Sequence, residues 1–275
     1  MSTTAHSELI RDAAAGGPAG ADAPSPRERF AAPSLLRLTK VELRKASDTR
    51  AGRWLLLSAV LIAAAVAIAR ALTGSLADRT FAGSLELTLL PLGVLLPVIG
   101  ILLVTSEWSQ RTALATFSLV PHRQRVAASK LLAALVLGVG AALVSVAMAA
   151  LGNLVGIAAT DADGSWAMSA GTLGQALLGM ELNLLMGLGF GLLLMSPALA
   201  IVLFFALPTV FTILGGMISS LEKTFEWIDP NQAFDPLTNG SMHGDDWGKL
   251  VVCTLLWVGV PLLAGLGRLM RREVK

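Results

Sequence analysis

The chain has few of the residues that build disulfides, metal centres and charged surfaces. Its 275 residues include one cysteine and three histidines, and only 15% are charged. One cysteine excludes an intrachain disulfide, and a soluble domain of this length needs more charge to cover its surface. The histidines, His6, His122 and His243, all lie outside the apolar segments, so no pair could hold a metal within a membrane. The net charge of +2 gives no indication of a nucleic-acid partner.

Enzyme motifs are also absent. The sequence contains no H-E-x-x-H and no G-x-S-x-G. The segment from Gly244 to Leu250 comes nearest to a nucleotide-binding P-loop, but it is one residue too short between its glycines and has no Ser or Thr after the lysine. Asp161 and Asp163 begin like a calcium loop without its glycine and closing glutamate, so we expect a solvated turn there. We therefore expect no catalytic, metal or cofactor site in this chain.

Apolar residues dominate instead, at 54% of the sequence with a mean hydropathy of +0.69. They form runs of about 20 residues, each long enough to cross a bilayer core as a helix. We predict an all-α membrane protein with spans at about 54–72, 87–105, 131–152, 173–195, 197–218 and 249–267. Only Ser196 and Pro197 separate the fourth span from the fifth, and proline is well suited to begin a helix.

The charged residues outside these spans indicate the topology. Residues 1–32 are rich in Ala, Gly, Pro, Ser and charge, which predicts a disordered tail before a six-span domain at 33–275. The N-terminal segment, the loop after the second span and the C-terminus carry 17 Lys and Arg, whereas the other loops carry 4. The positive-inside bias therefore predicts that both termini are cytoplasmic.

A basic segment at 34–45 precedes the first span. Its basic residues, Arg37, Lys40 and Arg44, fall on one stripe opposite several leucines, although Glu42 and Lys45 interrupt the apolar face. We favour a helix in the inner headgroup region over a simple solvated segment, because leucines beside a basic stripe are costly to leave in water.

Two other segments leave alternatives open. Glu181 and Asn183 lie in the middle of the fourth span, where an ionisable group is expensive and normally faces a bundle interior, a partner or a watery cavity. They either fix helix packing or lie along a transport path. The segment 219–248 mixes aromatic and charged residues, which fits short interfacial or re-entrant helices as well as a plain surface loop.

The most informative segment is the polar island at 107–130. Because the apolar runs on both sides cross the bilayer, the island lies outside the hydrocarbon and can meet a soluble partner. Its basic residues place it in the cytoplasm with the two termini.

This arrangement resembles the membrane subunits of type-2 ABC exporters, especially actinobacterial permeases. The resemblance covers residues 34–275 and rests on the basic segment, the six spans and the island. In that family the island runs from a glutamate through a threonine-rich helix start to a proline, basic residues and a lysine. The matching positions are Glu107, Thr112, Thr116, Pro121, Arg123, Arg125 and Lys130. Arg111 departs from the pattern, because many members have glycine there.

The resemblance implies a permease subunit in a bacterial plasma membrane. Two such subunits, identical or different, pair with two cytoplasmic ATPase subunits, which bind the ATP and magnesium. The island, Arg111 included, is implied to contain a coupling helix that contacts the ATPase, and the segment 34–45 is implied to border it. Membrane lipid is the remaining partner. The residues leave two alternatives, a proton-coupled secondary transporter with Glu181 as its relay and a non-transporting membrane immunity or assembly protein.

Overall fold

A computed structural model describes residues 33–75, 79–110, 112, 114, 116, 118, 120, 122–218, 220 and 222–271. Within these residues the regular elements are all helical, and no strand occurs. The tail at 1–32 lies outside the described residues, as do two of the island positions, Arg111 and Pro121.

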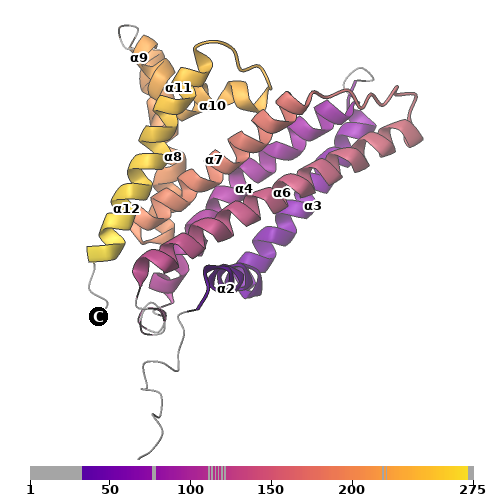
Figure 1. The fold of residues 1–275 in the computed structure, drawn as a ribbon. Helices are drawn as coiled ribbons and strands as arrows, with labels where there is room; N and C mark the ends of the chain where they lie inside the picture. Colours follow the sequence, from indigo (N-terminus) through magenta and orange to yellow (C-terminus); the bar gives the residue numbers. More distant parts are fainter. Residues whose placement is uncertain are drawn as a thin grey trace, which may run out of the picture. The chain divides into compact units, whose positions relative to one another are not determined.

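Six helices are long and apolar enough to cross a membrane (Figure 1). They are α3 (Arg50–Thr73), α4 (Phe81–Ser109), α6 (Arg123–Ala159), α7 (Ala170–Leu194), α8 (Pro197–Met217) and a C-terminal helix from Asp246 to Arg271. The last consists of α11 (Asp246–Thr254), a π-helical turn η3 (Leu255–Gly259) and α12 (Val260–Arg271). The prediction of an all-α chain with six membrane-length apolar helices is confirmed.

The backbone explains why α7 and α8 are two helices. Met195 adopts a left-handed conformation with φ of 53°, Ser196 is extended, and Pro197 is the first residue of α8. The non-helical conformations of Met195 and Ser196 end α7, and Pro197 suits the first turn of α8, where its missing N–H would have no partner in any case.

Hydroxyl side chains begin three of the other helices. Thr49, Thr80 and Ser169 accept hydrogen bonds from backbone N–H groups three residues further on, at 3.1, 3.2 and 2.9 Å. Each such cap satisfies one of the otherwise unpaired N–H groups of a first turn and stabilises the helix by about 1 kcal/mol.

The pair α4 and α7 forms the centre of the bundle. In the most apolar 18-residue stretch of each helix, 50% of α4 and 56% of α7 is buried within the protein. In the other four membrane-length helices the buried share of that stretch is between 22% and 33%. Small residues let the two backbones approach closely. A Cβ added at Gly187 of α7 would lie 2.5 Å from the carbonyl oxygen of Pro97 in α4. The less buried helices present apolar faces of the kind that suit lipid.

The segment 219–248 contains two short helices, α9 (Glu222–Ile228) and α10 (Pro230–Thr238), so the plain-loop alternative is wrong. Asp229 between them is fully buried. Its carboxylate accepts hydrogen bonds from Asn231 N at 3.0 Å and from the Thr212 hydroxyl of α8 at 2.8 Å. The indole N–H of Trp257 donates to the Ile228 carbonyl at 2.6 Å. These bonds hold the segment against α8 and the C-terminal helix.

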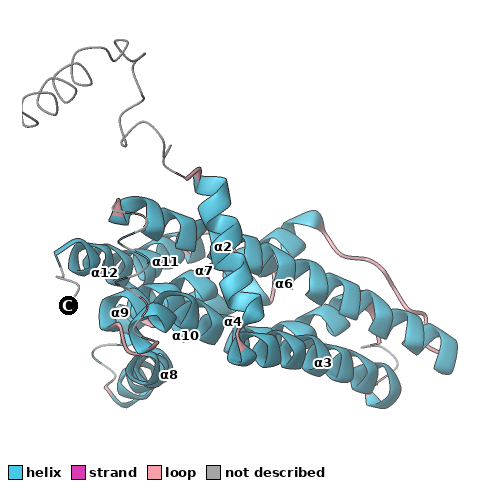
Figure 2. Ribbon diagram, turned by 90° about the horizontal axis from the view of Figure 1, so that it is seen from below, coloured by secondary structure: helices cyan, strands magenta, loops and turns pink. Residues whose placement is uncertain are grey.

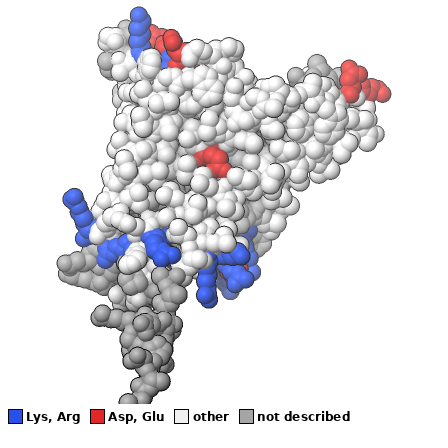
Figure 3. Space-filling view, viewed as in Figure 1, with Lys and Arg blue, Asp and Glu red and all other residues white. Residues whose placement is uncertain are grey.

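Charge is distributed unevenly between the two ends of the bundle. In Figure 3 most basic side chains gather along the lower edge of a broad belt with few charged residues. Acidic side chains lie at both upper corners, with a basic side chain at the left one, and one acidic patch lies within the belt. The lower end comprises the starts of α3 and α6, the end of α12 and the helix α2 (Leu35–Asp48), which lies across the bundle ends in the view from below (Figure 2). The described basic residues there are Arg37, Lys40, Arg44, Lys45, Arg50, Arg53, Arg123, Arg125, Lys130, Arg268 and Arg271.

The close contact between α4 and α7 predicts that Gly187→Ala destabilises the protein. The added methyl group overlaps the Pro97 backbone, and overpacking of this kind costs about 1–3 kcal/mol. Gly174→Ala on the same helix is the matched control, because its Cβ meets nothing within 4 Å. Thermal unfolding in detergent should show a lower Tm for Gly187→Ala and an unchanged or higher Tm for Gly174→Ala. Equal Tm values for the two variants would contradict the packing of this helix pair.

Candidate functional site

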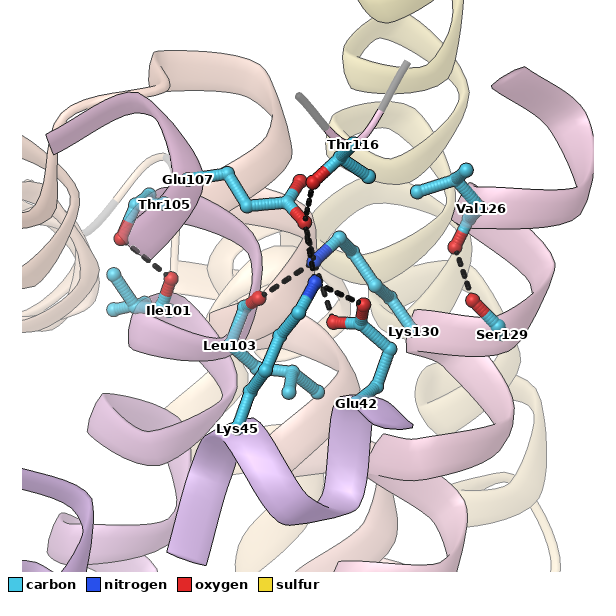
Figure 4. A network of polar contacts seen from close by, with 10 residues as sticks. All are labelled: Glu42, Lys45, Ile101, Leu103, Thr105, Glu107, Thr116, Val126, Ser129 and Lys130. Carbon is cyan, nitrogen blue, oxygen red and sulfur yellow. Dashed lines mark hydrogen bonds and ion pairs between the residues drawn. The ribbon is translucent and has the colours of Figure 1, made fainter. Parts of the chain in front are cut away.

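Four charged side chains from three helices meet where α2 crosses the ends of α4 and α6 (Figure 4). Glu42 and Lys45 come from α2, Glu107 from the last turn of α4, and Lys130 from the beginning of α6. We call these four residues the ion cluster. Two carboxylates and two ammonium groups give it no net charge.

Within the ion cluster each lysine lies between both glutamates. Lys130 Nζ is 2.6 Å from Glu42 Oε2 and 3.4 Å from Glu107 Oε1. Lys45 Nζ is 2.7 Å from Glu42 Oε1 and 2.8 Å from Glu107 Oε1. The side chains of Glu42, Glu107 and Lys130 are 5%, 5% and 4% exposed, whereas that of Lys45 is 37% exposed. The cluster is thus nearly sealed, with one lysine at its rim.

Two further hydrogen bonds complete the cluster. Lys130 Nζ donates to the Leu103 carbonyl of α4 at 3.1 Å, and the Thr116 hydroxyl of the island donates to Glu107 Oε1 at 3.1 Å. Buried ion pairs are tolerated when further hydrogen bonds satisfy the remaining polar atoms. The Thr116 bond also attaches the island directly to the cluster.

The spacing of charges along α2 explains how it can present two faces. Glu42 and Lys45 are three residues apart and so lie on the same side of a helix. That side faces the bundle and includes the buried Thr39, while Leu43 and Ala46 pack against the apolar core. The basic stripe of Arg37, Lys40 and Arg44 is exposed. The inward side of α2 is therefore partly ionic.

The described part of the island continues from α4 by backbone hydrogen bonds. Thr112 N donates to Glu107 O at 3.0 Å, Thr116 N to Thr112 O at 3.1 Å, and Val120 N to Thr116 O at 3.0 Å. Leu114, Thr116 and Ser118 are helical. Leu114 is 60% exposed, so this short helical segment carries an apolar side chain on its outer side.

Two arginines form hydrogen bonds to carbonyl groups at the ends of neighbouring helices. Arg123 Nη1 donates to the carbonyls of Leu269 and Met270 near the end of α12, at 2.9 and 3.3 Å. Arg268 Nη1 donates to the Leu193 carbonyl at the end of α7, at 2.6 Å. Cationic donors at helix C-termini satisfy unpaired carbonyls and complement the helix dipole. Arg125, another island position, is half-buried.

Two of the island residues predicted to contact an ATPase are buried in this chain. Glu107 and Lys130 are only 4% and 3% exposed and point into the ion cluster. Their contact with an ATPase stays a prediction. Sequence reasoning missed Glu42 and Lys45, which it treated as interruptions of an apolar face. The available signal was their opposite charge at a spacing of three.

The two polar residues inside the fourth span face different neighbours. Residues two apart on a helix point about 200° away from each other. The Glu181 carboxylate packs against Gly138 of α6, where an added Cβ would collide with it. Both of its oxygens are shielded from solvent and have no hydrogen-bond partner. Asn183 instead lines a cavity bounded by α7, α8 and α10. No group of three or more His, Cys, Asp or Glu that could hold a metal occurs among the described residues.

The buried pairing predicts that Lys130→Met destabilises the protein by about 3–5 kcal/mol, since it leaves buried carboxylates without a sufficient counter-charge. Lys40→Met removes an exposed lysine of α2 and should stay within about 0.5 kcal/mol of the wild type. The double variant Lys130→Met with Glu42→Gln should recover part of the loss, because the remaining Lys45 and Glu107 balance each other. Denaturant or thermal unfolding measures all three. Equal stability of Lys130→Met and Lys40→Met would contradict the cluster.

Lys45 gives the ion cluster a defined pH response. Burial lowers the pKa of Lys45, but hydrogen bonds to Glu107 and Glu42 and their negative charges outweigh burial and raise it above the usual 10.5. A raised pKa means that the contribution of Lys45 to stability is fully present below pH 10.5 and is lost as the pH rises through the raised value. The Tm difference between wild type and Lys45→Met should therefore be constant near neutral pH and shrink only in strong alkali. A difference that vanishes by neutral pH would contradict this pairing.

In sequence comparisons, no protein-family model matches the chain and no curated protein matches it. The functional assignment therefore rests on the residues and geometry of the chain itself.

Proposed function

We propose that this chain is the membrane permease subunit of an ATP-driven ABC exporter in a bacterial plasma membrane. In this proposal a separate cytoplasmic ATPase binds ATP and magnesium, and a second permease subunit, identical or different, completes the translocation unit. The chain itself contributes no ATPase site. Both termini and the island lie in the cytoplasm.

The observation that carries the proposal is the ion cluster. It joins the island, through Thr116 and Glu107, to α2, α4 and α6 at a single point. An element fixed this firmly to several helices can pass a rigid-body displacement to them, because packed interfaces move between discrete arrangements and do not deform continuously. The island is thus suited to receive a push or pull from a soluble partner.

The surface around the cluster supports the same assignment. The exposed Leu114 offers an apolar anchor on a short helical segment, and the basic residues of α2 surround the same end of the bundle. Basic residues collect on the cytoplasmic side of membrane proteins. A cytoplasmic ATPase would meet this end first.

The docking proposal predicts the effect of Leu114→Glu. A charge at the centre of an apolar contact should weaken association with the ATPase at least about tenfold, equivalent to 1.4 kcal/mol. The adjacent reading frames are first searched for a soluble protein with a Walker A motif, which the exporter proposal predicts. The chain is then co-expressed with that protein, and co-purification and ATP hydrolysis are measured. Thr224→Glu is the control, since it places the same charge at an exposed position of α9 at the opposite end. Unchanged assembly and ATPase activity in Leu114→Glu would refute docking through the island.

Glu181 favours a second candidate, a proton-coupled carrier. Its unpartnered, solvent-shielded carboxylate is the kind of intramembrane group that can serve as a relay. If the exporter assignment holds and Glu181 only packs against Gly138, Glu181→Gln keeps the shape of the side chain and should leave ATPase activity, transport and Tm unchanged. Loss of transport with an unchanged Tm would instead favour the proton-coupled carrier.

A further inference from the structure

A cavity of about 320 Å³ lies between α4, α7, α8 and α10. These helices are neighbours in the bundle, with α10 packed against both α7 and α8 (Figure 1). The volume falls within the range of roughly 300–1,000 Å³ that small-molecule sites occupy. The cavity is separate from the ion cluster, and none of the lining residues belongs to that cluster.

The two threonine hydroxyls of the cavity already donate their hydrogens within the protein. The hydroxyl of Thr209 donates to Phe205 O at 2.8 Å, and that of Thr238 donates to Asp235 O at 2.8 Å. The amide nitrogen of Asn231 donates one of its two hydrogens to the Thr212 hydroxyl at 2.9 Å. Each hydroxyl has a single donor hydrogen and two acceptor lone pairs. These hydroxyls can therefore offer a ligand only acceptors.

Asp235 adds a negatively charged acceptor to the lining. Its carboxylate is exposed and accepts a hydrogen bond from Asn239 Nδ2 at 3.1 Å. A carboxylate oxygen has lone pairs for more than one donor, so Asp235 can accept another hydrogen bond and supplies a negative charge. Asn183 also belongs to the lining, but its amide oxygen is shielded from the cavity.

The remaining walls are apolar and aromatic. Phe204, Phe205 and Phe234 line the cavity, and none of the described lining residues is lysine or arginine. Aromatic rings attract cations through their negative faces. The combination of acceptors, one carboxylate and phenylalanine walls suits a positively charged donor attached to an apolar body and disfavours an anion.

We propose that this cavity binds amphiphilic organic cations. Their ammonium group pairs with the Asp235 carboxylate, and their apolar body packs against the phenylalanines. Binding is a property of this chain alone, so it goes beyond the exporter proposal and requires no ATPase.

A substitution at Gly93 in α4 can fill part of the cavity without disturbing its other walls. A Cβ added at Gly93 meets nothing within 4 Å, so a larger side chain enters empty space without striking the protein. Gly93→Leu should therefore fill part of the cavity, and leucine is also a better helix former than glycine. Gly140→Leu on α6 is the matched control, because Gly140 is exposed, has equally open space and does not line the cavity.

The experiment uses the full chain in lipid nanodiscs and three fluorescent probes that share one dansyl group. Dansylcadaverine carries a terminal ammonium, its N-acetyl derivative is neutral, and dansyl-6-aminohexanoate is an anion. Fluorescence with empty nanodiscs is subtracted to remove partition into lipid. We expect saturable binding of dansylcadaverine, at least about tenfold weaker binding of the neutral probe, and no saturable binding of the anion.

The variants locate the binding. Gly93→Leu should weaken the binding of dansylcadaverine at least about tenfold, whereas Gly140→Leu should bind it with the affinity of the wild type. Asp235→Asn keeps the shape of the side chain and should reduce the preference for the ammonium probe over its acetylated form. Equal binding of all three probes, or wild-type affinity in Gly93→Leu, would overturn the proposal. Neither result depends on an ATPase, so these measurements test the cavity proposal independently of the exporter proposal.

Discussion

Three buried charges and one half-exposed charge make up the ion cluster, and they set the constraint on which this end of the bundle depends. Removing a charge from water costs several kcal/mol, and mutual attraction offsets this only when every partner is in place. Glu42, Lys45, Glu107 and Lys130 supply such a complete set. Because α2, α4 and α6 each contribute a charge, moving any one of these helices away would leave a buried charge on another without its partner. The cluster therefore makes their ends a single unit.

The rest of the bundle extends that unit across the apolar belt. α4 carries Glu107 at one end and packs against α7 through contacts too close for a side chain at Gly187. Arg123 and Arg268 link the starts and ends of α6, α7 and α12. A displacement applied to the island would accordingly reach the central helix pair. The cavity beside Asn183 lies against that same pair.

Hydropathy predicted the six membrane-length helices, because apolar runs of that length have few alternatives to spanning a bilayer. The split at Pro197 was predictable because proline suits the first turn of a helix. The opposite charges of Glu42 and Lys45 at a spacing of three could have indicated a polar face of α2. The partners of that face could not be predicted, since they lie 62 and 88 residues away along the chain. The separation of Glu181 from Asn183 likewise depends on which helices α7 meets. The cavity needed four helices to be placed before its acceptors could be seen together.

The ion cluster also imposes an order on biosynthesis. Glu42 leaves the ribosome first, and Lys130 follows 88 residues later. At the usual elongation rates that interval is on the order of 4–18 s. During it α2 has no complete set of counter-ions, so the buried ion pairs of Glu42 cannot yet all form. The final position of α2 is reached only after the third membrane-length helix has begun to emerge.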